Sequence, residues 1–152
     1  MRRVAYRAFG ALPPRVRRGI VALVAPSFTV GALAVLHDGG NFLFVTQLHR
    51  PGLALPGGLL KKGEQPRPAL DRELAEELGL RGVDFADAPD TAHVDAAKTR
   101  VDLLFFAAVD RAAISPRPAS EVLSFQWRTA DDPELTPQTR EILAGVASRL
   151  PR

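Results

Sequence analysis

The segment from Gly57 to Leu80 constrains the fold more than any other part of this 152-residue chain. Its two prolines, Pro66 and Pro68, are tolerated only in the first turn of a helix, where backbone amides have no intrahelical acceptor. Gly79 suits the left-handed conformation of the residue that ends a helix. The segment therefore predicts a helix of about three to four turns, from near Pro66 to Leu78.

The predicted helix has an apolar face and an acidic face side by side. At about 100° per residue, the apolar face consists of Leu70, Leu74 and Leu78, and the acidic stripe consists of Glu73, Glu76 and Glu77. Carboxylates three or four residues apart repel each other by about 0.2–0.5 kcal/mol per pair in an isolated helix. The stripe therefore indicates a positive partner, although a charged solvent face with chance clustering would show the same spacing.

A divalent cation would satisfy the acidic stripe more fully than the neighbouring Arg72. Mg²⁺ takes hard oxygen ligands and keeps water and substrate phosphate oxygens in its remaining positions, so phosphate chemistry is the natural use of such a stripe. The chain has no cysteine, which excludes zinc held by thiolates and a thiol nucleophile. The histidines lack metal-ligand spacing, so zinc is not supported by His37, His49 and His93.

The order of glycine and charged residues resembles a complete Nudix box. Gly58 is followed by Glu64 and then by Arg72-Glu73-Leu74-Ala75-Glu76-Glu77-Leu78-Gly79-Leu80. Agreement of the fixed identities by chance at a given start has odds on the order of one in a hundred million. The resemblance implies the Nudix fold, an α/β (α+β) architecture in which a mixed β-sheet is sandwiched between helices (α-β-α).

The resemblance to the Nudix family also implies a role for each charged residue of the box. The ligands of Mg²⁺ or Mn²⁺ would be the carbonyl of Gly57, Glu64 from the loop, Glu73, Glu76 and Glu77. Arg72 would orient Glu73. The proton of the attacking water would go to Glu73 or to an acid in a later loop, for which Glu121 is the candidate; a loop acid without a catalytic role is the alternative for Glu121.

Nudix enzymes hydrolyse a nucleoside diphosphate linked to another moiety, by attack of water on phosphorus. Residues 81–100 lack the Ser-Gln-Pro-Trp motif of NADH pyrophosphatases and the tyrosine of dinucleoside polyphosphate enzymes. They also lack a proline where ADP-ribose enzymes usually carry one, since Pro89 comes too early. A nucleoside triphosphate pyrophosphohydrolase resembling MutT is therefore the leading expectation. A Nudix-like sensor that binds a nucleotide without cleaving it, and an enzyme that acts on the 5′ end of RNA, are the alternatives.

Four residues outside the box are candidates for contacts with the substrate. Arg50 lies shortly before Gly57 and Gly58, at a position from which its guanidinium could bind a substrate phosphate in a bidentate manner. The alternative is a surface arginine without such a role. Phe28, Trp127 and His49 could stack on or flank a base, although lone aromatic residues on strands are more often core residues.

Hydrophobic periodicity and turn residues predict the remaining elements. Strands are expected at 28–36, 42–47, 53–55, 101–109 and 122–127, with a hairpin at Asp38-Gly39-Gly40-Asn41 and with Leu123, Phe125 and Trp127 on one face. The last helix is expected to begin at Pro137 with Thr136 as its N-cap. Its buried stripe would consist of Ile142, Leu143, Val146 and Leu150.

The first part of the chain is basic, and the rest is mildly acidic. Residues 1–37 contain six arginines and no acid, whereas the whole chain has a net charge of +3. We expect residues 1–27 to form a basic N-terminal helical extension, with helical pieces at 4–12 and 16–24, and residues 28–152 to form a single Nudix hydrolase domain. The extension could steer anions, lie on RNA or on an anionic membrane, or simply be a solvated helical face.

The uncharged run from Gly19 to Leu36 is long enough to raise the question of a membrane span or a secretory signal. Pro26, Ser27 and Thr29 interrupt it, so a helix end followed by a strand is expected, without stable membrane insertion. The absence of cysteine favours a cytoplasmic setting, and the excess of arginine over lysine favours a bacterial source. The expected partner is a small nucleotide rather than nucleic acid, and a homodimer remains open.

Overall fold

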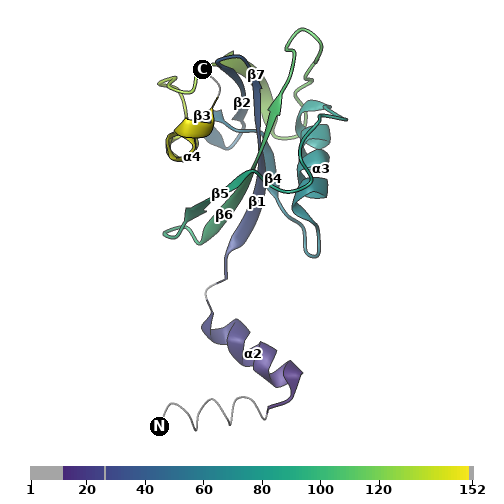
Figure 1. The fold of residues 1–152 in the computed structure, drawn as a ribbon, viewed down its shortest axis with the longest axis vertical. Helices are drawn as coiled ribbons and strands as arrows, with labels where there is room; N and C mark the ends of the chain where they lie inside the picture. The colour runs from purple at the N-terminus through teal and green to yellow at the C-terminus, as the bar shows by residue number, and fades with distance from the viewer. Residues whose placement is uncertain (1–11, 26, 151–152) are drawn as a thin grey trace.

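The computed structural model describes residues 12–25 and 27–150, so most of the first expected helical piece lies outside the described residues. One sheet lies between two helices, so the domain has three layers, and a further helix near the N-terminus lies apart from them (Figure 1). In chain order the described helices and strands are α2 (Pro14–Val24), β1 (Thr29–Asp38), β2 (Asn41–Gln47), β3 (Arg50–Ala54), β4 (Gly57–Leu59), α3 (Pro66–Leu78), β5 (Thr91–Asp95), β6 (Arg100–Ala108), β7 (Val122–Arg128), α4 (Pro137–Gly145) and the short 3₁₀ helix η1 (Ala147–Arg149).

The seven strands form a mixed sheet in which β1 connects the parts. β1 runs parallel to β6 over its whole length, and its first half also pairs antiparallel with β4. The expected hairpin joins β1 to β2 at Asp38 and Asn41. β2 then lies between β3 and β7 and is antiparallel to both, while β5 pairs with β6 at the other edge.

The two faces of the sheet are covered by different helices, which confirms the expected α-β-α sandwich (Figure 1). Successive side chains of a strand point to opposite faces. Ala32 and Ala34 of β1 accordingly pack in the core beside α3, whereas Leu33 and Val35 pack in the core beside α4. The α3 core contains the predicted Leu70, Leu74 and Leu78, and the α4 core contains the predicted Ile142, Leu143 and Val146, with Leu150 packed against it.

Helix α3 begins and ends where its prolines and glycine predict. It runs from Pro66 to Leu78, and Gly79 follows in the left-handed conformation with φ of 65°. The amide of Gly79 donates to the carbonyl of Ala75, and the next amide donates to the carbonyl of Leu74. This helix end satisfies carbonyls that have no partner inside the helix.

Two strands and one side chain differ from the expectation. β4 and β5 were not predicted, because β4 contains two glycines and β5 is a short polar edge strand. Phe125 and Trp127 share a partly buried face, but Leu123 is exposed, so its predicted place on that face is wrong. The pairing of β7 with β2 skips Leu123 as a β-bulge, which breaks the alternation and buries Val122 instead.

The uncharged run divides as expected into the end of α2 and the start of β1. Among the described helices, none has the length and apolar character that a membrane crossing requires.

Candidate active site

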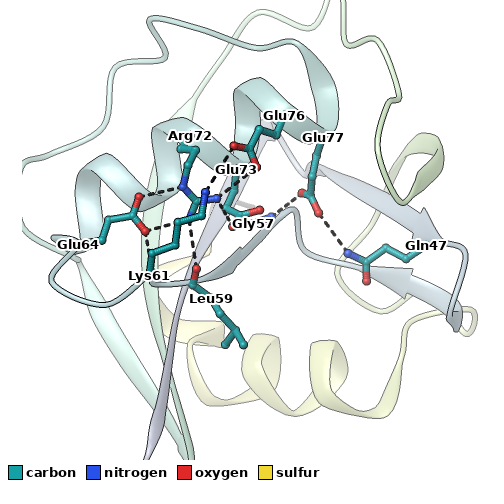
Figure 2. A network of polar contacts seen from close by, with 9 residues as sticks. All are labelled: Gln47, Gly57, Leu59, Lys61, Glu64, Arg72, Glu73, Glu76 and Glu77. Carbon is teal, nitrogen blue, oxygen red and sulfur yellow. Dashed lines mark hydrogen bonds and ion pairs between the residues drawn. The ribbon is translucent and has the colours of Figure 1, made fainter.

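Strand β4 and helix α3 bring Gly57 and Gly58 against two carboxylates of the Nudix box. Figure 2 shows the contact of Gly57 with Glu77. The amide of Gly57 donates to Oε2 of Glu77 at 2.9 Å. Gly58 lies beneath Glu73: a Cβ atom at Gly58 would stand 2.6 Å from Cδ of Glu73. At Gly57, φ is 123° and a Cβ would stand 2.2 Å from the carbonyl oxygen of Ala32. Position 57 therefore requires glycine, because its backbone conformation and the nearby backbone of β1 leave no room for a Cβ, whereas a Cβ at Gly58 would displace the carboxylate of Glu73.

Arg72 binds two carboxylates of the acidic stripe, those of Glu73 and Glu76, and also the loop carboxylate of Glu64 (Figure 2). Its Nε and Nη2 atoms donate to the two oxygens of Glu64 at 2.8 and 2.9 Å. Its Nη1 atom donates to Glu73 at 2.6 Å and to Glu76 at 3.3 Å. The hydrogen bonds from Arg72, followed by the one from the Lys61 amide, lower the pKa of Glu64 to about 2. Both oxygens of Glu64 are thus engaged by Arg72.

Glu77 is the buried member of the stripe, with 3% of the residue exposed. Burial raises the pKa of Glu77 from 4.5 to about 7, against the opposing effect of the Gly57 amide. The charge of Glu73 raises this pKa further, the hydrogen bond from Gln47 at 3.3 Å lowers it, and the charge of Glu121 raises it. Among the residues that the structure describes, the hydrogen-bond donors to Glu77 are the Gly57 amide and the Gln47 side chain, and neither is a cation.

The carboxylate oxygens of the stripe are suitable ligands for a hard divalent cation. Carboxylates with a nearby backbone carbonyl are the oxygen ligands that Mg²⁺ and Mn²⁺ prefer. In the described part of the chain, no three acidic or histidine side chains already converge as a cation cluster. Arg72 instead holds Glu73 and Glu76. A buried carboxylate with a raised pKa beside these two gives the ion a charge to neutralise.

A cleft of about 260 Å³ lies at Gly57 and Gly58, and its lining includes several predicted residues but none of the carboxylates of the stripe. Gly57 and Gly58 form part of its wall, and Arg50, His49 and Glu121 line it as well. The structure thus brings Arg50 and Glu121, which are far apart in the sequence, to the same cleft as the glycines of the box.

Phe28 and Trp127 are not among the residues that line this cleft. Phe28 lines a separate shallow hollow together with Glu64 and the loop before α3. Trp127 packs, partly buried, against the core beneath α3. Their proposed contacts with a base stay predictions, and the position of Trp127 is that of a core residue.

A network of polar side chains that was not predicted from the sequence lies on the side of the cleft that contains Arg50 and Arg100. Asp102 is completely buried, and its carboxylate pairs with Nη2 of Arg100 at 2.7 Å. The amide nitrogen of Gln138 donates to Asp102 at 2.7 Å, and Nη1 of Arg50 donates to the amide oxygen of Gln138 at 3.3 Å. A Cβ at Gly31 would stand 2.5 Å from Asp102, so the glycine leaves room for the carboxylate.

One feature of the sequence could have indicated part of this polar network. Arg100 and Asp102 are two residues apart on a strand and therefore share a face. No local pattern identifies Gln138 as their partner, because it lies 36 residues further on in α4.

The raised pKa of Glu77 predicts a pH-dependent stability of the metal-free protein. The contribution of a neutral Glu77 is fully present below its unfolded pKa of 4.5 and is lost as the pH rises through its folded pKa of about 7. Without divalent ions, the wild-type protein should therefore lose about 3 kcal/mol of unfolding free energy relative to Glu77→Gln between about pH 4 and pH 8. Urea unfolding of both proteins across this range measures it, and a constant difference would contradict the assigned burial effect.

Comparisons with known proteins agree with this geometry. A family model described as NUDIX domain matches residues 27–146. An RNA pyrophosphohydrolase from Mesorhizobium japonicum is 33% identical over 95 residues, which cover 62% of this chain and 53% of the relative. A Mycobacterium tuberculosis protein, provisionally named 8-oxo-dGTP diphosphatase 2, is 48% identical over 52 residues, which cover 32% of this chain and 37% of the relative. The matches thus span about half or less of these curated relatives.

A solved structure shows the same fold over a larger share of the chain. The MutT Nudix hydrolase from Burkholderia pseudomallei aligns with a TM-score of 0.60 and 28% identity, over 78% of this chain and 97% of that one. The family match extends from the start of β1 through α4 and includes the whole acidic stripe. This chain belongs to the Nudix family.

Proposed function

We propose that this Nudix protein hydrolyses the phosphoanhydride bond of a nucleoside diphosphate derivative in a reaction that depends on Mg²⁺ or Mn²⁺. A nucleoside triphosphate is the leading substrate. The observation that carries the proposal is the contact of Gly57 and Gly58 with Glu77 and Glu73, on the wall of a cleft that also contains Arg50.

Glu73, Glu76, Glu77 and the carbonyl of Gly57 are the proposed ligands. A divalent ion bound there would lower the pKa of a water molecule and offset the charge that develops on the phosphate oxygens. Glu64 was also predicted as a ligand, and its hydrogen bonds favour a role through Arg72, whose guanidinium it holds at both oxygens. Arg72 in turn orients Glu73.

Two carboxylates are proposed to accept the proton of the attacking water. In the metal-free protein Arg72 holds one oxygen of Glu73 at 2.6 Å and so orients this carboxylate before an ion binds. Glu121 lines the cleft, and its charge reaches far enough to raise the pKa of Glu77. A general base must lie within hydrogen-bond reach of the water that it activates, directly or through one further water.

The arginine side of the cleft is proposed to bind the phosphates or another polar group of the substrate. Arg50 is oriented by Gln138, and Arg100 is oriented by the buried Asp102. A guanidinium that is already oriented loses little conformational entropy when it binds an anion, which favours bidentate contacts with phosphate oxygens. Arg100 joins Arg50 as a candidate substrate contact, whereas Asp102 and Gln138 position them.

The setting proposed for this activity follows from composition and fold. Residues 28–152 would form the hydrolase domain, and residues 1–27 the extension. Cytoplasmic location is supported by the lack of cysteine. A bacterial source is supported by the excess of arginine.

Product identification on a nucleotide panel tests the proposed function. The panel contains nucleoside triphosphates, 8-oxo-dGTP, ADP-ribose, a dinucleoside polyphosphate and a 5′-triphosphorylated RNA. The RNA is included because the M. japonicum relative is named an RNA pyrophosphohydrolase. We expect phosphate-containing products with Mg²⁺ or Mn²⁺ and none with a chelator. Glu77→Gln should keep the fold and reduce kcat at least about a hundredfold, as expected when a group that acts in the transition state is removed.

Tight nucleotide binding without any product would favour the sensor and contradict the proposal. Preferential cleavage of the RNA over every small nucleotide would select the RNA alternative within the same chemistry.

Replacing Gly58 by alanine separates the geometry of the site from the stability of the fold. The three atoms nearest to the new Cβ would all belong to the carboxylate of Glu73, which can move away. We expect the melting temperature to stay within a few degrees of the wild-type value and the turnover to fall about a hundredfold. Gly145→Ala is the matched control, because a Cβ there meets nothing within 4 Å. Equal turnover in both variants would show that the position of Glu73 is unimportant.

A further inference from the structure

Helix α2 exposes an apolar stripe that no described part of the domain covers. It is 11 residues long, and Figure 1 shows it apart from the sheet and from α3 and α4. Val16 is 46% exposed, Ile20 is 38% exposed and Leu23 is 86% exposed. At about 100° per residue these three side chains lie within about 60° of one another. Water is an unfavourable environment for such a stripe.

The three charged residues of α2 are all arginines, and two of them flank the stripe. Arg15 follows one edge of the stripe and Arg17 the other, while Arg18 points to the opposite side. Such side chains can lay their aliphatic part along an apolar surface while the guanidinium remains in a polar layer. Val21 is 48% exposed but lies outside the stripe, which makes it a useful reference.

The charge around α2 is opposite to that of the rest of the protein. Residues 1–37 contain six arginines and no acid, and the remainder has a net charge of −3. A partner for this segment must therefore offer both negative charge and an apolar layer. The surface of an anionic lipid bilayer offers both.

We propose that α2 docks on an anionic membrane surface, with Val16, Ile20 and Leu23 in the interfacial layer and the arginines among the lipid headgroups. RNA would attract the arginines, but its phosphate backbone offers no apolar layer in which the stripe could be buried. A second copy of this chain would bring the same positive charges against each other. At about 1.5 Å per residue the helix is far too short to cross a bilayer core of about 30 Å, so it lies on the surface. The docking does not depend on the proposed hydrolase activity.

Vesicle co-sedimentation of the full chain tests the docking. The vesicles are pure phosphatidylcholine or phosphatidylcholine with about 30 mol% phosphatidylglycerol. The protein should partition onto the anionic vesicles at least about tenfold more strongly. Raising the salt from about 0.1 to about 0.5 M should weaken this binding.

Matched serine variants distinguish membrane binding through the stripe from nonspecific binding by any exposed apolar side chain. Ile20→Ser combined with Leu23→Ser should reduce partitioning about tenfold or more, because the charge is unchanged but the apolar stripe is lost. Val21→Ser should change it by less than about twofold. All three positions are exposed, so thermal unfolding should be the same in every variant, which excludes misfolding as the cause.

Three results would overturn the proposal. The first is equal binding to both vesicles, and the second is equal loss in the stripe and Val21 variants. The third is no vesicle binding together with either tight binding of a single-stranded RNA oligonucleotide or a dimer that the stripe variant dissociates, measured by fluorescence anisotropy and light scattering.

Discussion

The hydrogen bond from the Gly57 amide to the buried carboxylate of Glu77 joins the functional helix to the sheet, and the rest of the site depends on it. Its partners come from β4 and from the last turn of α3, so it fixes how far the helix slides along the sheet. The leucines of α3 bury the apolar face, but an apolar face alone tolerates small shifts. A single buried acceptor with a single amide donor does not tolerate them.

The burial of Glu77 that this contact requires also affects the charge of its carboxyl group. Burial raises the pKa of Glu77 to about 7, so the folded protein holds this group close to the point where it gains its negative charge. Arg72 neutralises the more exposed carboxylates of the stripe and leaves Glu77 to the backbone and to Gln47. The site is thus stable without a cation and still presents acidic oxygens in one place. A metal ion would compete with Arg72 for Glu73 and Glu76, while Glu64 would keep Arg72 close by.

The parts of the fold that local chemistry determines could be predicted from the sequence. Proline and glycine fixed the ends of α3, and Thr136 capped α4 as expected, accepting from the amide of Thr139. Apolar runs and the turn residues of the hairpin identified the central strands, although β1 is buried on both faces and not on one face as its alternation predicted. Strand β4 could not be recognised, because its glycines are required by tertiary contacts with Ala32 and Glu73 rather than by strand propensity. The bulge at Leu123 depends on the register of a strand far away in the sequence.

The candidate site divides in the same way. The acidic stripe and its arginine follow from helical spacing, and Arg50 and Glu121 do lie at the cleft. The buried Asp102 with Arg100 and Gln138 escaped prediction, because its members come from β6 and α4 and meet only in the folded protein. Phe28 and Trp127 were chosen for their aromatic character, which does not tell a core position from a binding one.

Anomalous diffraction from crystals soaked with Mn²⁺ tests the central claim most directly. We expect an ion at the acidic edge of α3, within about 2.0–2.3 Å of oxygens from Glu73 and Glu77, with Arg72 turned away from Glu73 and still bound to Glu64. An ion found only elsewhere on the protein, with Arg72 still bound to Glu73 and Glu76, would contradict the claim that this stripe is a cation site.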